Sequence, residues 1–260
     1  MLAKISIGAV FAEAWVMFRR RFASILVLAL VQNLWAALVL VRAFLPPPWM
    51  ETTAVTLLLI GAGGIVFLVA SLAILLLAEG GRRFSIGRLA GRFVPAFLAT
   101  FLCVGLLALP SYAVLAIADH LGAVDTIETT TAAALFLLLV LIVVSSYLLV
   151  TLPACVLEGL GPLKSIGRSI ALGKGQRWHL IAILMILAVW FLGIDFIGTR
   201  LARALSLQFG FPLDYALLPA IFLALFLFFM PLSLVIGAAH RQMLRARAGV
   251  GVDELALVFE

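Results

Sequence analysis

Residues 131–168 have the sequence TAAALFLLLVLIVVSSYLLVTLPACVLEGLGPLKSIGR, and this stretch decides the fold. Its first part, from about Thr131 to Leu157, is uncharged and exceeds the roughly 20 apolar residues that a helix needs to cross a bilayer core. Glu158-Gly159 and a glycine-proline turn end the apolar run, and Lys164 and Arg168 follow four residues apart. The stretch therefore predicts a membrane-spanning helix followed by a basic segment at one membrane surface.

Five further stretches of the 260-residue chain have the same apolar character. Hydrophobic residues make up 65% of the sequence and charged residues 12%, whereas a typical soluble domain has about 25% charged residues. We therefore predict an all-α integral membrane protein that forms a single membrane domain over residues 1–260. Its six transmembrane helices are expected at about Phe22 to Leu45, Ala54 to Ala78, Phe93 to Ala118, Thr131 to Leu157, Leu180 to Ile197 and Tyr215 to Ala238.

Lysine and arginine are distributed unequally between alternate loops. Of the 18 lysines and arginines, only Arg42, Arg200 and Arg203 fall on one predicted side of the membrane. Cytoplasmic loops carry an excess of basic residues, so both termini are expected in the cytoplasm, with residues 241–260 as a short tail. The same topology accounts for the net charge of +6, which therefore does not argue for nucleic-acid binding.

A repeat of about 80 residues accompanies the predicted spans. Ser-Ile-Gly occurs at 6–8, 85–87 and 165–167, and Glu-Gly precedes the last two copies at 79–80 and 158–159. We expect three repeat units, at about 1–80, 81–160 and 161–245. Each unit would consist of a short amphipathic interfacial helix followed by a helical hairpin.

The interfacial segments combine apolar and basic residues. In the third unit, Leu163, Ile166 and Ile170 share one side of a helix, and the basic residues lie on another. One interpretation is a helix in the headgroup plane that contacts anionic lipid or a membrane-protein partner. The other is a helical linker packed under the bundle, whose basic residues enforce the topology. On the first interpretation the contact residues are Arg19, Arg20, Arg21, Arg88, Lys164, Arg168, Lys174 and Arg177.

Two regions of the chain resemble a bacterial membrane-domain family. These regions are Ser6-Ile7-Gly8 with Ala14-Trp15 and Phe18-Arg19-Arg20, and the segments 153–159, 163–169 and 172–178. The family is found fused to some glycerophosphoryl diester phosphodiesterases and as stand-alone multispan proteins. The resemblance implies a bacterial cytoplasmic (inner) membrane location. It implies no phosphodiesterase activity here, because the catalytic domain of those enzymes is a separate soluble barrel and about twenty residues follow His240.

Few polar side chains interrupt the spans, and four of them form a possible intramembrane polar site: Gln32, Asn33, Ser145 and Asp195. Hydrogen bonds between helices are the favoured role of the first three, and lining a substrate path is the alternative. For Asp195, near the outer end of the fifth span, we favour an ion pair with Arg200, Arg203 or Arg42 over a proton or ion relay.

No catalytic motif accompanies these residues. The sequence lacks a Gly-x-Ser-x-Gly elbow, a Walker loop and a His-Glu-x-x-His pair. We therefore expect no enzymatic activity, no cofactor, no metal and no disulfide. The favoured function is membrane or envelope organisation through lipid or partner-protein contact. The alternatives are a transporter or channel for a small or lipidic solute and, less favoured, a lipid-processing enzyme.

Overall fold

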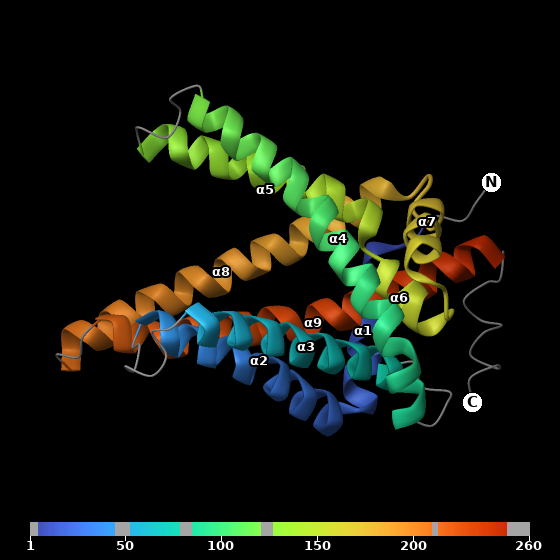
Figure 1. The fold of residues 1–260 in the computed structure, drawn as a ribbon, viewed down its shortest axis with the longest axis horizontal. Helices are drawn as coiled ribbons and strands as arrows, with labels where there is room; N and C mark the ends of the chain where they lie inside the picture. Colours follow the sequence, from blue (N-terminus) through green and yellow to red (C-terminus); the bar gives the residue numbers. More distant parts are fainter. Residues whose placement is uncertain (1–4, 45–52, 79–84, 121–126, 210–212, 249–260) are drawn as a thin grey trace.

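The protein is a bundle of α-helices. The computed structural model describes residues 5–44, 53–78, 85–120, 127–209 and 213–248, and no strand occurs among them. This result confirms the predicted all-α class. In chain order the helices are α1 (Ile7–Arg20), α2 (Phe22–Phe44), α3 (Thr53–Ala78), α4 (Ile86–His120), α5 (Ile127–Leu148), α6 (Thr151–Leu157), α7 (Pro162–Leu172), α8 (Arg177–Phe209) and α9 (Leu213–Ala248) (Figure 1).

Within the described part, five helical stretches are long and apolar enough to cross a membrane. A shorter apolar stretch, Phe22–Asn33, lies in α2. The outward faces of the bundle are apolar as well: Phe101 is 69% exposed and Val189 is 63% exposed. Such exposure fits lipid as the surrounding solvent, so the structure supports a membrane helical bundle. The five stretches are Gly61–Ala78, Ile86–Ala113, Phe136–Leu157, Arg177–Phe209 and Ala220–Arg247.

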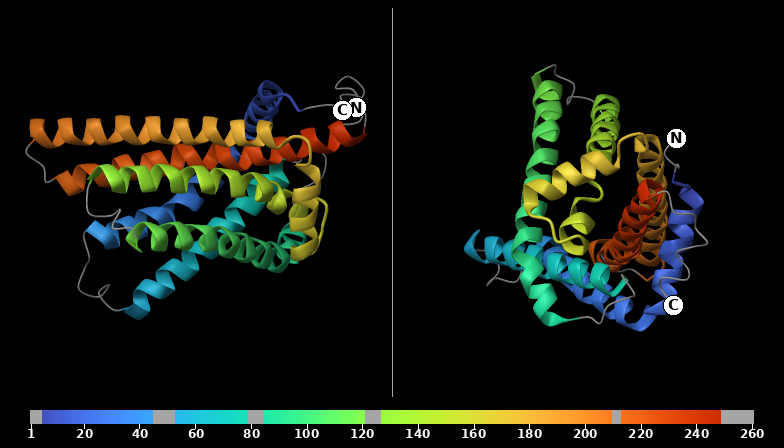
Figure 2. Two further views of the ribbon diagram at one scale, coloured as in Figure 1. Left: turned by 90° about the horizontal axis from the view of Figure 1, so that it is seen from above. Right: turned by 90° about the vertical axis from the view of Figure 1, so that its right-hand side faces the viewer.

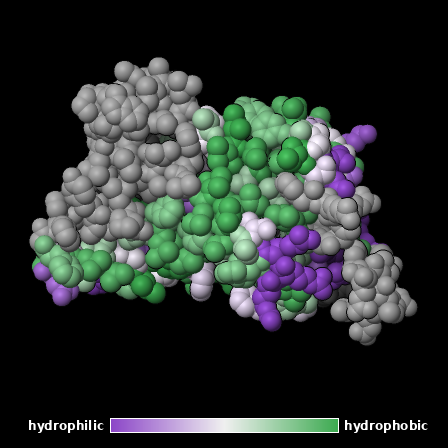
Figure 3. Space-filling model, turned by 90° about the horizontal axis from the view of Figure 1, so that it is seen from below, coloured by the Kyte–Doolittle hydropathy of each residue, from purple (hydrophilic) through white to green (hydrophobic). Residues whose placement is uncertain are grey.

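The long helices α8 and α9 form the central pair of the bundle. The hairpin of α2 and α3 packs against α9, and α4 and α5 form a second hairpin that contacts α3 and α8. This second hairpin diverges from α8 with distance from α7 (Figures 1 and 2). The helices α1, α6 and α7 lie at the same end of the bundle as the last turns of α9 (Figure 2). Hydrophilic residues gather there (Figure 3), and we call it the basic end.

The fourth predicted span is not one continuous helix. It divides into α5 and α6, and Leu149 and Val150 form the turn between them. Pro153 explains the division, because proline has no backbone N–H and its ring clashes with the carbonyl of the residue four positions earlier, Leu149. After α6 the chain reverses through Gly159, whose positive φ of 76° favours glycine.

Three other boundaries differ from the prediction. In the second unit the expected interfacial helix is not separate, because α4 runs without interruption from Ile86 to His120. No glycine-proline turn follows Arg92, whereas one separates α6 from α7. Prolines 95 and 110 lie inside α4 without ending it. Helices α8 and α9 also extend beyond the predicted fifth and sixth spans, so Asp195 lies inside α8 rather than near its end.

Candidate lipid-contact site

Helix α7 packs against the bundle through two serines and through Leu172 in its last turn, all of which are buried. Ser165 and Ser169 are 0% and 1% exposed. The Ser169 hydroxyl donates a hydrogen bond of 2.7 Å to the Tyr147 carbonyl, which belongs to the last turn of α5. The carbonyls in the last turn of a helix receive no hydrogen bond from an N–H group of the same helix, so they need a donor from elsewhere. Ser169 therefore caps α5 where the fourth span is broken.

Two apolar side chains of α7 that precede Leu172 nevertheless face outward. Leu163 is 74% exposed and Ile170 is 40% exposed, and Trp178 at the start of α8 is 81% exposed. Lys164 and Lys174 are exposed beside them. Apolar side chains next to ammonium groups are typical of helices that lie in the headgroup plane, and tryptophan is enriched at that depth. We call these five residues the α7 surface.

Glu158 joins three helices at the basic end. It follows α6, and its carboxylate accepts a hydrogen bond of 2.9 Å from Nε of Arg168 in α7. The other carboxylate oxygen lies 2.8 Å from Nε2 of His240 in α9. His240 is 1% exposed, so this contact lies inside the bundle. Arg168, a predicted lipid contact, thus has an internal partner and contributes to the packing of the basic end.

Helix α1 is attached to α9 by a second acidic residue. The Glu13 carboxylate accepts hydrogen bonds from Nε2 of Gln242 at 2.7 Å and from Nη1 of Arg245 at 3.0 Å. Nevertheless, Trp15 and Val16 of the same helix are 58% and 46% exposed. Both α1 and α7 therefore pack against the bundle and also present apolar side chains outward. This geometry is compatible with both predicted interpretations of these segments.

The other predicted contact residues differ in their surroundings. Arg19, Arg20 and Arg21, at the end of α1 and just after it, are exposed. Arg88 is half-buried near the start of α4. The guanidinium of Arg177 lies over the Tyr147 ring, 3.6 Å from its centroid. The exposed members of the predicted set are therefore Arg19, Arg20, Arg21, Lys164 and Lys174.

The predicted intramembrane polar site is not assembled. Gln32 and Asn33 are both 1% exposed on α2, and Nε2 of Gln32 donates to the Ser71 hydroxyl of α3 at 3.0 Å. Nδ2 of Asn33 donates to the Ala29 carbonyl of its own helix at 2.7 Å. Ser145 lies on α5 and Asp195 on α8, and no hydrogen bond or ion pair between described residues links these four positions. The Gln32 contact supports the helix-joining role.

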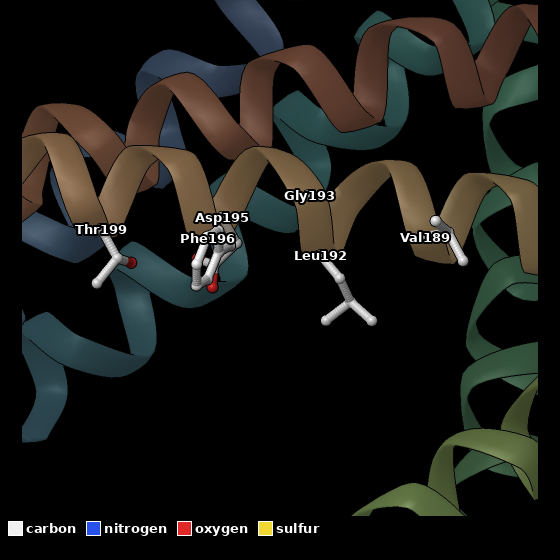
Figure 4. Close-up of a pocket in the computed structure, with 6 residues that line it drawn as sticks. All are labelled: Val189, Leu192, Gly193, Asp195, Phe196 and Thr199. Atoms are coloured by element: carbon white, nitrogen blue, oxygen red, sulfur yellow. The ribbon is translucent and has the colours of Figure 1, made fainter.

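Asp195 is half-buried on the side of α8 that lines a hollow of about 630 Å³. In Figure 4 the side chains of Val189, Leu192, Asp195, Phe196 and Thr199 project to one side of the helix. Within the described part the Asp195 carboxylate forms no ion pair, so the expected pairing with Arg200 or Arg203 is not observed. The Arg200 guanidinium instead lies 5.1 Å from the Phe196 ring centroid. The side chain of Arg42 lies outside the described residues.

Ser169 and His240 make contacts that join helices at the basic end, and the sequence pattern did not indicate either residue. The recurring Ser-Ile-Gly-Arg sequence drew attention to Arg168, but serine and histidine near a basic segment are too common to predict burial. The small residues Gly237, Ala238 and Ala239 before His240 were an available signal, because they allow close helix approach. Among the described residues no three histidines, cysteines, aspartates or glutamates are grouped as metal ligands.

Comparison with known proteins gives no match. No family model, curated protein or solved structure matches this chain. The resemblance to a bacterial membrane-domain family stays a prediction, and the geometry of the basic end is the basis for a functional proposal.

Replacing Ser169 by alanine should destabilise the protein by about 1–2 kcal/mol, because it leaves the Tyr147 carbonyl, at a part-buried position, without the donor that Ser169 supplies. The matched control is Ser111→Ala, since the Ser111 hydroxyl bonds only to Leu107 of its own helix among the described residues. Thermal unfolding of both variants in the same detergent measures the difference. Equal melting temperatures for the two variants would contradict the capping role of Ser169.

The Glu158–Arg168 pair should show coupling in a double-mutant cycle. We expect Glu158→Gln and Arg168→Gln each to lower the free energy of unfolding, and the double variant to lose about 1 kcal/mol less than the sum, because the ion pair is lost only once. Lys174→Gln in the Glu158→Gln background supplies the control, since Lys174 is exposed. Strictly additive losses for Glu158→Gln and Arg168→Gln would show that the two side chains do not interact.

Proposed function

We propose that this chain is a non-enzymatic, six-span protein of the bacterial cytoplasmic membrane that binds anionic lipid headgroups at its basic end. In this proposal both termini are cytoplasmic, and lipid binding serves membrane or envelope organisation. The observation that carries it is the outward orientation of Leu163 and Ile170 beside exposed Lys164. An apolar surface that faces outward beside positive charge matches the boundary between acyl chains and anionic headgroups.

The free energy of burying the outward side chains of α7 and Trp178 supports lipid binding at the basic end. Leaving Leu163, Ile170 and Trp178 in water would expose large apolar areas, and burying one such side chain is worth about 1.5–3 kcal/mol. The acyl boundary can bury them while lysine ammonium groups remain at the headgroups. Each basic residue near an anionic surface adds about 1 kcal/mol of attraction. Lys164 and Lys174 together therefore favour anionic over neutral lipid.

The contacts of the interfacial helices support the three-unit architecture within this proposal. Helix α1 of the first unit packs against α9 of the third, and α7 of the third unit packs against α4 and α6 of the second. An acidic–basic contact accompanies each of these packings, Glu13 with Arg245 and Glu158 with Arg168. Each helix would thus connect two units, and this arrangement suits a scaffold whose basic end keeps a fixed shape.

The ionisable side chains of the basic end favour a structural over a catalytic role. Glu13, Glu158 and His240 are engaged with partners inside the protein, and Arg241 donates to the Ala78 carbonyl. A transporter or channel, the alternative function, would need a polar path through the bundle. Of the four candidate residues for that path, Gln32 and Asn33 are instead buried and form hydrogen bonds to neighbouring helix residues, and no hydrogen bond or ion pair among the described residues links the four positions.

Lipid composition in nanodiscs tests the proposal. The full chain is reconstituted from an equal mixture of phosphatidylglycerol and phosphatidylcholine, and the lipids that co-purify with it are quantified by mass spectrometry. We expect enrichment of phosphatidylglycerol, and a loss of roughly five-fold in that preference for each of Lys164→Gln and Lys174→Gln. The matched control is the double variant Lys164→Arg with Lys174→Arg, which changes the same two side chains and keeps both positive charges. An unchanged preference in the double variant Lys164→Gln with Lys174→Gln, or an equal loss in the control, would contradict the proposal.

A further inference from the structure

The hollow on α8 lies at a defined depth in the bilayer. Arg177 begins α8 at the basic end, and Asp195 follows 18 positions later, which corresponds to about 27 Å along a helix. A hydrocarbon core is about 30 Å thick, so Asp195 and Thr199 lie at the level of the opposite headgroups. Val189 and Leu192 lie closer to the middle of the bilayer. The hollow therefore extends from the acyl chains to the headgroups of the leaflet remote from the basic end.

The chemistry of the hollow changes along the same direction. Its inner part is lined by Val189 and Leu192, which are 63% and 53% exposed. Gly193 adds no side chain there, and a Cβ at this position would meet nothing within 4 Å. Its outer part presents the Asp195 carboxylate and the Thr199 hydroxyl, four residues apart on one side of the helix (Figure 4). The hollow is thus apolar within the core and polar at the headgroup level.

One charged residue, Asp195, lines the outer end of this hollow, and an oppositely charged residue lies at its edge. The half-buried Asp195 carboxylate has no ion pair among the residues that the structure describes. Arg200 is exposed and does not itself line the hollow, but its guanidinium lies 5.1 Å from the ring centroid of Phe196, which does. A carboxylate attracts an ammonium group, and a guanidinium binds phosphate well. This pair of charges is complementary to a headgroup that carries both an ammonium and a phosphate.

We propose that this hollow binds a phospholipid with a zwitterionic, primary-amine headgroup, of the phosphatidylethanolamine class. One acyl chain lies against Val189, Leu192 and Phe196, the ammonium contacts Asp195, and the phosphate contacts Arg200. Thr199 supplies a further hydrogen-bonding group to the headgroup. The site goes beyond the proposed function, because it selects a different lipid in the other leaflet, and it shares with that function only the crossing of the bilayer by α8.

A comparison of two headgroups tests this site on the unaltered protein. The full chain is reconstituted in nanodiscs from equal amounts of dioleoyl-phosphatidylethanolamine and dioleoyl-phosphatidylcholine, and the retained lipid is quantified by native mass spectrometry. The trimethylammonium of phosphatidylcholine carries the same charge but donates no N–H hydrogen bond. We expect phosphatidylethanolamine to be preferred by roughly three- to five-fold, the size of one net hydrogen bond, because only its ammonium can donate to the Asp195 carboxylate. Equal retention of the two lipids would overturn the proposal without any need for a variant.

Two variants then locate the preference. Asp195→Asn removes the charge with little change of shape and should abolish the preference, whereas Asp195→Glu should retain it. Lys164→Gln is the control, because it lies at the opposite end of the bundle and should leave this preference unchanged. If Asp195→Asn keeps the preference, or Lys164→Gln loses it, the site is not at Asp195. Conversely, loss of phosphatidylglycerol enrichment in Lys164→Gln with normal phosphatidylethanolamine selection separates this site from the proposed function.

Soluble phosphoethanolamine distinguishes a lipid from its headgroup alone. The headgroup without acyl chains cannot use the apolar wall of Val189 and Leu192, so an excess of it should leave the bound phospholipid in place. Displacement of the phospholipid by soluble phosphoethanolamine would show that the apolar wall contributes nothing and would overturn the lipid assignment.

Discussion

The hydrogen bond from Ser169 to the Tyr147 carbonyl is the contact on which the basic end depends. Pro153 breaks the fourth span, and the carbonyls that end α5 lose the donors that a continuous helix would supply. An unpaired carbonyl in an apolar environment is costly, so a donor must come from elsewhere in the chain. Ser169 provides that donor from α7, and this turns the serine side of α7 toward the bundle.

The orientation of α7 in turn determines which side chains meet the membrane. Leu163 and Ile170 face outward because the serines face inward, and Arg168 comes within reach of Glu158. Glu158 also contacts the buried His240, so α6, α7 and α9 are held by one carboxylate. Separating these helices would leave partly buried charges without partners, which costs free energy. The arrangement of the helices at the basic end is therefore resistant to small changes. A rigid basic end is a suitable platform for lipid headgroups.

The sequence was sufficient to predict the helical class, the membrane environment and most helix positions, because apolar runs and basic clusters report directly on the solvent of each segment. It did not show which side of α7 packs inward. In water an apolar stripe faces the core, but in lipid the outward side is also apolar, so periodicity alone does not distinguish the two. The orientation of α7 depends on a small polar residue, Ser169. Its partner, the Tyr147 carbonyl, needs a donor only because the helix is interrupted before α6.

The candidate sites, too, could be predicted only in part from the sequence. Lys164, Lys174 and Arg168 share the pattern of basic residues that follow a span, but the two lysines are exposed, whereas Arg168 pairs with Glu158 inside the protein. Asp195 was expected near a helix end with an arginine partner, but α8 continues to Phe209 and the described arginines do not pair with it. The length of α8 and the partner of each charge are consequences of tertiary packing, and local sequence does not contain them.

Spin-label accessibility on α7 tests most directly whether this helix lies in the membrane interface with its serine side inward. Nitroxides are placed singly at Leu163 and Ile170, and at Lys174 as the aqueous reference, in the protein reconstituted into phospholipid vesicles. We expect oxygen, which partitions into lipid, to relax the labels at 163 and 170 more than a water-soluble nickel chelate does, with the opposite order at 174. Greater accessibility to the nickel chelate at 163 and 170 would contradict this placement of α7.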